Sequence, residues 1–266
     1  MQASSPGSLA SLDGEVMLAS EATIPATDEG LIRGDGVFEV IRLHDGRPFA
    51  FDRHLARMER SARNLRLEVD LEAIRADAWR LLAHAGSGHE DDLLRIVVTR
   101  GGRRLLMTEP MPAAPEIVRL GSVTYAPTRI LDGIKSLSYG PNMLAGRLAR
   151  ERGFDEALLV TPHGRVLEAP TSSIFWVKDG ELLTPPLDEH ILASITRAVV
   201  LEVTDARERV CELDQLLAAD EVFIASTTRE VQPVAAVDAR SYDGDGHVTA
   251  RAAAAVSERI RSELDG

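Results

Sequence analysis

The sequence predicts a mixed α/β protein built from two domains, and three observations support this. Residues 37–43 alternate apolar and polar side chains as a strand does, whereas residues 55–65 repeat apolar side chains at helical spacing. A chain of 266 residues is long enough to form two cores. The segment Pro127-Thr128-Arg129 has the composition of a linker. We therefore expect a small N-terminal domain over residues 1–120, a linker over 121–129 and a larger C-terminal domain over 130–266.

Both element types recur along the chain after the first eleven residues, which are rich in Ser, Gly and Ala and are expected to be frayed. Strands are predicted for short apolar or alternating runs, at residues 15–18, 37–43, 48–51, 92–100, 117–120, 122–125, 156–160, 166–169, 174–177 and 221–224. Helices are predicted at residues 52–65, 71–85, 142–152, 195–202 and 250–264. Asp52 is expected to cap the first helix, and Leu144 and Leu148 are expected to face the core from the third.

Charge and cysteine content exclude several classes of partner and predict a cytoplasmic protein. The formal net charge of −12 argues against nucleic acid or an anionic membrane as the main partner, although local arginines still permit a small anionic ligand. The single cysteine, Cys211, rules out an internal disulfide and fits a reducing compartment. Neither a signal peptide nor an apolar run long enough for a membrane helix is evident, and no metal site is predicted.

Lysine is rare in this chain, and one of the two lysines stands out. The 30 basic residues include only Lys135 and Lys178, and the rest are arginine. Arginine stays protonated, whereas a partly desolvated lysine can lose its proton and form a Schiff base with an aldehyde. Lys178 lies in a turn signal and is expected to be solvated. The sequence around Lys135 is apolar, which favours a reactive amine. The alternative is a lysine at a strand edge whose amine reaches solvent.

Three polar features suggest a phosphate site. Ile195-Thr196 opens a predicted helix, where free backbone N–H groups and the positive end of the dipole favour an anion. Ser226-Thr227-Thr228 supplies hydroxyl groups and amides directly after a strand, and Arg57 supplies a positive charge. Each feature also has a simpler interpretation, as a helix cap, a turn and a solvated helix face.

A reactive lysine together with a phosphate site is what pyridoxal 5'-phosphate (PLP) requires. A carboxylate beside the pyridine nitrogen would keep that nitrogen protonated and make the ring an electron sink. Glu168 is the candidate, because it ends a predicted strand beside the hydroxyl cluster that contains Ser172. The alternative is an ordinary surface glutamate.

Charged residues near two other strands are candidates for substrate binding. Glu39 falls on the apolar face of the strand at 37–43, which indicates either a charge pointing into a site or an edge-strand charge that prevents aggregation. Arg103 and Arg104 follow the strand at 92–100, and they are interpreted either as a clamp on a substrate carboxylate or as part of a solvated loop.

Six motifs in a fixed order resemble those of one family. They cover about residues 15 to 245 and are Gly34-Asp35-Gly36-Val37-Phe38-Glu39, His54-Leu55-Ala56-Arg57, Ile134-Lys135-Ser136-Leu137, Leu167-Glu168-Ala169 with Ser172-Ser173-Ile174-Phe175, Ile191-Leu192 with Ile195-Thr196-Arg197, and Glu221-Val222-Phe223 with Ser226-Thr227-Thr228. In this order they resemble the class IV aminotransferases, which are PLP enzymes of fold type IV. That family includes branched-chain and D-amino acid aminotransferases, (R)-amine transaminases and aminodeoxychorismate lyases.

The resemblance implies a two-domain α/β (α+β) protein with the cofactor between its domains, working as a homodimer. It implies that Lys135 is the Schiff-base lysine and proton carrier, Arg57 the phosphate arginine and Glu168 the partner of the pyridine nitrogen. The remaining cofactor residues would be Ser172, Ile195, Thr196, Ser226 and Thr227, and the substrate residues would be Phe38, Glu39 and Thr228. Arg103 and Arg104 stay substrate candidates from their residue type alone, because their loop offers too little motif to align with the family. Many members have Pro-Gly where this chain has Ala193-Ser194, so the shape of the phosphate site is expected to differ in detail.

The predicted function is PLP-dependent transamination between an amino donor and a 2-oxo acid. The donor is left open between a branched-chain L-amino acid, a D-amino acid and a primary amine. One alternative is an aminodeoxychorismate lyase that releases pyruvate, although Glu39 resembles the transaminase members more than the lyases. A second alternative is a non-catalytic PLP-binding protein, but the pairing of Lys135 with Glu168 argues against simple binding, which needs no electron sink.

Overall fold

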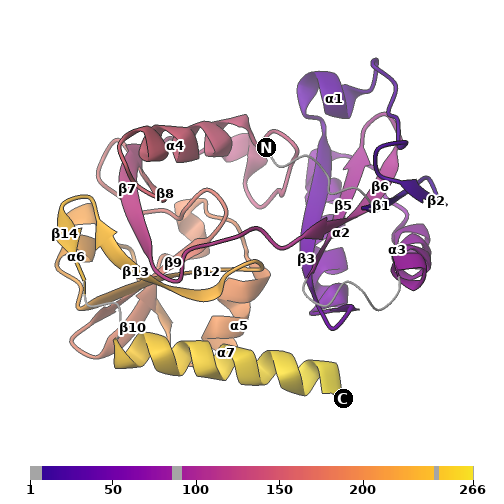
Figure 1. Cartoon of the computed structure of the whole chain (residues 1–266). Coiled ribbons are helices and arrows are strands. Elements are labelled where there is room, and N and C mark those ends of the chain that lie inside the picture. Colours follow the sequence, from indigo (N-terminus) through magenta and orange to yellow (C-terminus); the bar gives the residue numbers. More distant parts are fainter. Residues whose placement is uncertain (1–7, 86–91, 243–245, 266) are drawn as a thin grey trace. The chain divides into compact units, whose positions relative to one another are not determined.

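The computed structural model describes residues 8–85, 92–242 and 246–265, and the chain in it divides into two compact units (Figure 1). Unit 1 consists of Met1–Pro112 together with Gly133–Tyr139. Unit 2 consists of Ala113–Asp132 and Gly140–Gly266. The chain therefore leaves unit 1, begins unit 2, returns to unit 1 for seven residues and then completes unit 2. Those seven residues carry Lys135.

Unit 1 is an antiparallel sheet with helices packed against it (Figure 1). Within the described residues its six strands run in the order β2-β1-β6-β5-β3-β4. The strands are β1 (Leu9–Leu12), β2 (Glu15–Leu18), β3 (Gly36–His44), β4 (Arg47–Pro48), β5 (Asp92–Thr99) and β6 (Arg104–Pro110). The helices are α1 (Glu29–Arg33), α2 (Phe51–Leu65) and α3 (Leu71–Ala85).

The two-residue repeat of β3 and the helical repeat of α2 meet in the core of unit 1. Val37, Ile41 and Leu43 alternate along β3 and are fully buried against Leu55 and Met58 of α2. Glu39 belongs to the same buried face, so its carboxylate points at α2 rather than at solvent. The interpretation of Glu39 as an edge-strand charge that prevents aggregation is therefore wrong, because its side chain is fully buried.

The start of α2 differs from the prediction. The helix begins at Phe51, and Ala50 precedes it in the left-handed region with φ of 54° and no capping side chain. Asp52 lies in the first turn, where its negative charge favours the helix dipole, and pairs with Arg75 of α3 at 2.7 Å.

The returning segment Gly133–Tyr139 is tied to the first residues of β3. The N–H of Phe38 donates to the carbonyl of Lys135 at 3.1 Å, and the N–H of Leu137 donates to the carbonyl of Gly36 at 2.9 Å. This close approach explains the Gly-Asp-Gly motif. A Cβ at Gly36 would lie 2.5 Å from a carbonyl of β5, and Gly34 has a left-handed φ of 68° with Ser138 against it.

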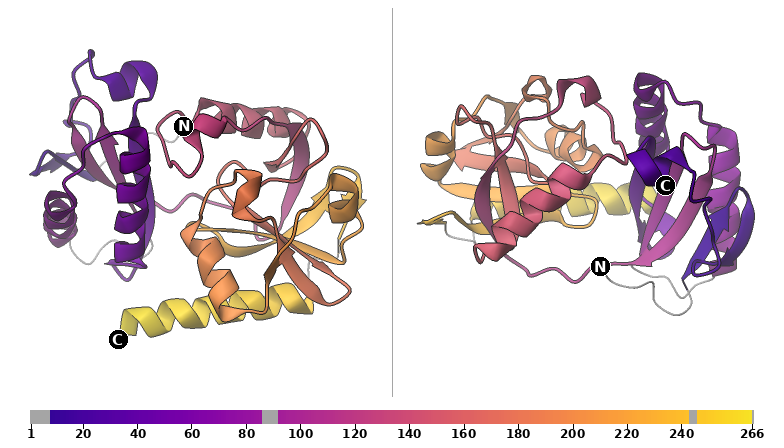
Figure 2. Two further views of the ribbon diagram at one scale, coloured as in Figure 1. Left: turned by 180° about the vertical axis from the view of Figure 1, so that it is seen from behind. Right: turned by 90° about the horizontal axis from the view of Figure 1, so that it is seen from above.

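Unit 2 is a mixed sheet flanked by helices (Figures 1 and 2). Its strands run in the order β11-β10-β9-β12-β13-β7-β8, with β14 paired to β13. The strands are β7 (Val118–Thr124), β8 (Glu156–Val160), β9 (Ser173–Lys178), β10 (Glu181–Thr184), β11 (Arg207–Glu208), β12 (Glu221–Ser226), β13 (Glu230–Val237) and β14 (Arg240–Ser241). The α-helices are α4 (Gly140–Glu151), α5 (Ile195–Val203), α6 (Leu213–Leu217) and α7 (His247–Asp265), and 3-10 turns occur at Arg129–Leu131 and Leu187–Glu189.

Helix α4 turns a different face to the sheet from the one predicted. Leu144 and Leu148 are 51 % and 41 % exposed, whereas Ala145, Gly146 and Ala149 are buried. The small side chains let α4 pack closely on β7 and β8, so packing distance rather than hydrophobicity selects the inner face.

Several predicted boundaries differ from the observed ones because of backbone pairing. The two extended pieces expected at 117–120 and 122–125 form the single strand β7, which pairs with β8 and β13 of unit 2. Residues 166–169 form isolated bridges rather than a strand. Part of the N-terminal stretch expected to be frayed, Leu9–Leu12, is strand β1, while residues 1–7 lie outside the described residues.

Candidate active site

Lys135 lies in an aromatic environment in unit 1. Its Nζ is 4.2 Å from the centre of the Phe38 ring and 5.6 Å from the centre of the Tyr139 ring. The two rings meet edge to face at 5.3 Å. The backbone N–H of Lys135 donates to Ser61 Oγ at 3.1 Å. The rings of Phe38 on β3 and Tyr139 on the returning segment therefore form the surroundings of the amine.

A buried ionic cluster lies in the same unit. Arg57 donates through Nε to Glu39 Oε1 at 2.7 Å and through Nη2 to Oε2 at 2.6 Å, which makes a bidentate pair. His54, one helical turn before Arg57, contacts Glu39 Oε2 through Nδ1 at 2.8 Å. All three side chains are at least 95 % buried. The helical spacing of His54 and Arg57 places both over one carboxylate of β3.

The protonation states of this cluster follow from its contacts. Burial raises the pKa of Glu39, but the charge and hydrogen bonds of Arg57 and the hydrogen bond of His54 outweigh burial and lower that pKa to about 2. Burial lowers the pKa of His54, and the positive charges of Arg57 and Lys135 lower it further. The hydrogen bond and the negative charge of Glu39 raise this pKa, but the net shift is downward. His54 is therefore neutral at pH 7. Because an ionised carboxylate only accepts, the proton of the neutral ring is on Nδ1.

In unit 2, Glu168 is positioned by a backbone amide and by polar neighbours. The N–H of Leu192 donates to both carboxylate oxygens, at 3.3 and 3.2 Å. Tyr125 donates to Asn142 Oδ1 at 3.2 Å, and Asn142 donates to the carbonyl of Pro170 at 3.1 Å. Burial raises the pKa of Tyr125, and the negative charge of Glu168 raises it further. Glu168 is half-buried, and the polar contacts around it define its position.

Helix α5 begins three residues after Leu192 and presents an anion-binding terminus. Ser194 is the N-cap, and its Oγ accepts the N–H of Arg197 at 3.3 Å. The first backbone donor within the helix is Ala198, so the amides of Ile195 and Thr196 precede the ladder of helical hydrogen bonds. Ser194, at the position where many members of the resembled family have glycine, is thus the helix cap.

Hydroxyl groups add to the polar lining of unit 2. Ser172 Oγ is buried and has no hydrogen-bond partner within the described residues. Ser226 ends β12, and its Oγ lies 3.4 Å from Thr228 Oγ1 across Thr227. Orphaned hydroxyls and open amides fit a phosphate group, and a half-buried carboxylate fits a protonated ring nitrogen. The residues present therefore fit PLP.

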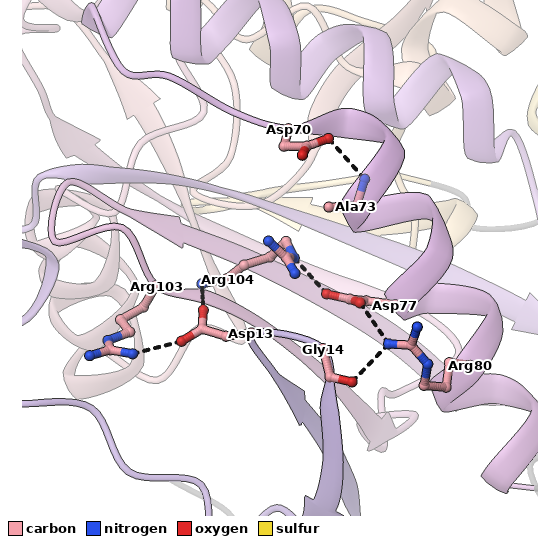
Figure 3. A network of polar contacts seen from close by, with 8 residues as sticks. All are labelled: Asp13, Gly14, Asp70, Ala73, Asp77, Arg80, Arg103 and Arg104. Atoms are coloured by element: carbon pink, nitrogen blue, oxygen red, sulfur yellow. Dashed lines mark hydrogen bonds and ion pairs between the residues drawn. The ribbon is translucent and has the colours of Figure 1, made fainter.

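Arg103 and Arg104 are engaged elsewhere in unit 1 (Figure 3). Arg103 Nη1 donates to Asp13 Oδ2 at 2.7 Å, and Arg104 Nε donates to Asp77 Oδ2 at 2.5 Å. The side chain of Asp77 is 3 % exposed, and Arg80 also donates to it. These contacts join the loop before β6 to α3 and to the turn between β1 and β2.

The structure thus divides the predicted site residues into two groups. Unit 1 brings together Phe38, Glu39, Arg57 and Lys135, which with His54 and Tyr139 we call the lysine cluster. Unit 2 carries seven other candidates, which are Glu168, Ser172, Ile195, Thr196, Ser226, Thr227 and Thr228. Together with Tyr125, Asn142 and Leu192 we call them the glutamate cluster. Sequence reasoning had missed His54, Tyr139, Tyr125 and Asn142. The three-residue spacing of His54 and Arg57 was the one available signal.

Comparisons with known proteins agree with this fold. The family model for class IV aminotransferases matches residues 36–237. A putative branched-chain-amino-acid aminotransferase of Methanocaldococcus jannaschii is 33% identical over 252 residues, covering 86% of this chain and 88% of its own length. A D-alanine aminotransferase of Bacillus licheniformis is 30% identical over 275 residues, covering 94% and 96%. A hypothetical aminotransferase from Mycobacterium tuberculosis in a PLP-bound form superimposes with a TM-score of 0.87 at 26% identity, covering 96% of this chain and 99% of that one.

The chain belongs to the class IV aminotransferases and has their fold type IV architecture. It is a PLP-dependent aminotransferase whose substrates are amino and keto acids, and pyridoxal 5'-phosphate is its cofactor. The lyase alternative gains no stronger support from these matches. No helix among the described residues is long and apolar enough to cross a membrane. Over the same residues, His, Cys, Asp and Glu form no group that could hold a metal ion.

Proposed function

We propose that this aminotransferase uses Lys135 of unit 1 as the covalent cofactor residue and as the proton carrier. We also propose that, within unit 2, the residues of the glutamate cluster contact PLP. The observation that carries the proposal is the position of Lys135 Nζ beside the Phe38 and Tyr139 rings and close enough to His54 to depress its pKa. The other lysine, Lys178, is half-buried, and its Nζ lies 3.5 Å from Asp220 Oδ1.

Each residue has a role that follows from its chemistry. When bound, PLP supplies an aldehyde for amines and a ring that accepts electrons from the substrate carbon. The substrate amine would replace Lys135 Nζ on the cofactor. The freed Nζ would then carry the proton from the substrate Cα to the cofactor carbon. Glu168 holds a proton on the ring nitrogen by its negative charge. The Phe38 and Tyr139 rings limit the directions in which the lysine amine can move.

Phosphate-binding residues are proposed within each unit by itself. In unit 2, the amides of Ile195 and Thr196 and the hydroxyl of Thr227 offer donors, with Ser226 beside them. In unit 1, Arg57 is the proposed phosphate arginine, and Glu39 fixes the plane of its guanidinium group through two hydrogen bonds. We assign Ser172 to the cofactor, and Phe38, Glu39 and Thr228 to the substrate pocket. Arg103 and Arg104 remain proposed carboxylate binders that would have to exchange Asp13 and Asp77 for substrate.

The wider setting is also proposed. A homodimer with no nucleic acid or membrane partner is supported by the net charge of −12 and by the family resemblance. A cytoplasmic location is supported by the free, buried Cys211, whose pKa burial raises to about 12. Light scattering of the purified protein tests the proposed dimer. A monomeric mass at micromolar concentration would contradict the dimer.

The experiment that tests the function is the visible absorption spectrum of the purified, PLP-loaded protein. The spectrum is recorded before and after separate additions of D-alanine, L-leucine and an (R)-amine. We expect a cofactor band that one donor converts to the pyridoxamine form, which would also identify the donor class. A band that no donor changes would favour the lyase alternative, which is then tested by pyruvate release from aminodeoxychorismate. A protein that never acquires a band would contradict the proposal.

A further inference from the structure

The turn between β12 and β13 carries hydroxyl groups that we assign to the cofactor phosphate. Ser226 ends β12 and pairs with Glu230, the first residue of β13, so Thr227, Thr228 and Arg229 form the loop between them. The N–H of Arg229 closes the turn by donating to the carbonyl of Ser226 at 3.2 Å. Glu230 has a left-handed φ of 52°, which a residue with a side chain adopts only at a cost in free energy. The turn therefore needs contacts from outside itself to keep this shape.

The side chain of Arg229 supplies such contacts. Its Nη2 donates to Glu156 Oε2 at 2.5 Å, and its Nη1 donates to Gln232 Oε1 at 2.7 Å. Glu156 is the first residue of β8, and β7 lies between β8 and β13 in the sheet. Arg229 thus ties the turn to the strand beyond the neighbour of β13.

The network around Arg229 is buried and continues to a second fixed point. The side chains of Arg229 and Glu156 are 17 % and 8 % exposed, and Gln232 is buried too. The Nε2 of Gln232 donates to the carbonyl of Pro115 in the segment before β7. Burial raises the pKa of Glu156, and the positive charge of Arg229 opposes that rise. Because water screens this pair little, the pair can fix the position of the turn.

We propose that Arg229 is a positioning residue for the cofactor phosphate, because it holds the turn in the conformation that presents Ser226 and Thr227. This inference rests on the proposed assignment of those two residues to the phosphate and adds the side chain that holds them in place. The charge of Arg229 is already engaged by Glu156, so we assign it no direct contact with the phosphate. Loss of Arg229 should weaken the binding of the phosphate and leave the binding of the rest of the cofactor unchanged.

The test compares two cofactors that differ only in the phosphate. The full-length protein is loaded with PLP or with pyridoxal, which carries a hydroxyl group instead, and the absorption of the cofactor in equilibrium dialysis gives both dissociation constants. The wild type should bind PLP more tightly than pyridoxal. Arg229→Met should lower the affinity for PLP about tenfold and leave that for pyridoxal unchanged, because only PLP uses the turn. An equal loss for both cofactors would show a merely structural role and overturn the proposal, as would no loss for either.

Two further variants separate the role of Arg229 from general damage to unit 2. Arg229→Lys keeps the charge but not the planar fork, so it should recover part of the affinity for PLP. Arg152 is the matched control, because it also joins a carboxylate, that of Asp238 at 3.1 Å, to a second acceptor, the carbonyl of Ser122. Arg152→Met should leave both affinities unchanged. A loss of PLP affinity in Arg152→Met as large as that in Arg229→Met would overturn the proposal.

A double variant keeps the test decisive if Arg229→Met fails to fold. Arg229→Met/Glu156→Met removes both charges of the buried pair, so no charge is left buried without its partner. It should show the same loss of affinity for PLP alone. A folded double variant that binds PLP as tightly as the wild type would overturn the proposal.

Failure of this inference can be told apart from failure of the proposed function. Borohydride reduction of the loaded wild type fixes either aldehyde on the lysine that binds it, so a wild type labelled on no lysine would contradict the proposed function. The affinity ratio of PLP to pyridoxal still tests this inference in that case, because dialysis also measures non-covalent binding. A wild type labelled on Lys135 whose affinity ratio is the same as that of Arg229→Met would overturn this inference and leave the function of Lys135 intact.

Discussion

The two units present their site residues by different means. The lysine cluster of unit 1 depends on side chains that hold one another, with Glu39 bound by Arg57 and His54 under full burial. The glutamate cluster of unit 2 depends on the backbone, through the amide of Leu192 and the open start of α5. Side-chain charges can be removed by a single substitution, whereas backbone amides cannot. The stability of unit 1 should therefore be sensitive to isosteric changes of the kind that leave the stability of unit 2 nearly unchanged.

The largest expected effect is the loss of activity in Lys135→Ala. Removing the amine eliminates both the covalent attachment of the cofactor and the proton carrier, so turnover should fall by about 10⁴-fold or more. Lys135→Arg should fail similarly, because a guanidinium group stays protonated. Lys178→Ala is the matched control and should retain full activity. Steady-state kinetics with the best donor measures all three, and near-normal turnover in Lys135→Ala would refute the assignment.

The next largest effect is on stability in unit 1. Glu39→Gln removes one partner of a buried pair and leaves the charge of Arg57 uncompensated, which should lower the free energy of unfolding by about 3–5 kcal/mol. Asp13→Asn removes an exposed pair of the same type in the same unit and should cost less than about 1 kcal/mol. Urea unfolding measures both. Equal losses in the two variants would mean that burial does not distinguish the pairs.

The same substitution predicts a pH dependence. Because the pKa of Glu39 is lowered from 4.5 to about 2 on folding, its carboxylate stabilises the protein above pH 4.5. That contribution is lost as the pH falls towards 2 and amounts to about 3 kcal/mol. The difference in unfolding free energy between the wild type and Glu39→Gln should therefore shrink as the pH falls below 4.5. A constant difference between pH 6 and pH 3 would contradict the assigned ionisation.

In unit 2, Glu168→Gln should separate function from stability. Glutamine still accepts the amide of Leu192 but carries no charge, so activity should fall by about 100-fold while the free energy of unfolding changes by less than about 1 kcal/mol. The pKa of Tyr125 should fall as well, because the negative charge of Glu168 raises it alongside burial. Ultraviolet titration of Glu168→Gln and wild type measures this shift, and an unchanged tyrosine titration would argue that Glu168 does not face Tyr125.

The smallest effect is expected at the start of α5. Ser194→Ala removes the cap on the amide of Arg197, which should cost about 1 kcal/mol of stability. PLP affinity should weaken only a few-fold, since the amides of Ile195 and Thr196 remain in place. Loss of PLP binding in this variant would show that the serine hydroxyl, and not the backbone, is the main phosphate ligand.

The sequence singled out two candidate residues but not the residues that surround them. Lys135 was proposed because lysine is rare in this chain, and Glu168 because it ends a predicted strand beside a hydroxyl cluster. The pairing of Glu39 with Arg57 could not be predicted, because the two lie 18 positions apart on a strand and a helix, and each was assigned a separate role. Which face of α4 is buried also escaped prediction, because close packing favoured Ala145 and Ala149 over two leucines.

Chain topology was the other feature that local patterns did not show. The return of Gly133–Tyr139 to unit 1 depends on hydrogen bonds to Gly36 and Phe38, nearly a hundred residues away. The linker expected at 121–129 therefore lies inside the first segment of unit 2, Ala113–Asp132, rather than between the two units. The Gly-Asp-Gly motif was visible, but its cause, the approach of Ser138 and of β5, belongs to the tertiary structure.

The most direct test of the central claim is to map the residue that binds the cofactor. The PLP-loaded protein is reduced with borohydride, digested and analysed by mass spectrometry, which is unambiguous because the chain has two lysines. We expect the phosphopyridoxyl group on the peptide containing Lys135 and none on the peptide containing Lys178. A label on Lys178, or a protein that binds PLP but yields no labelled lysine peptide, would contradict the account.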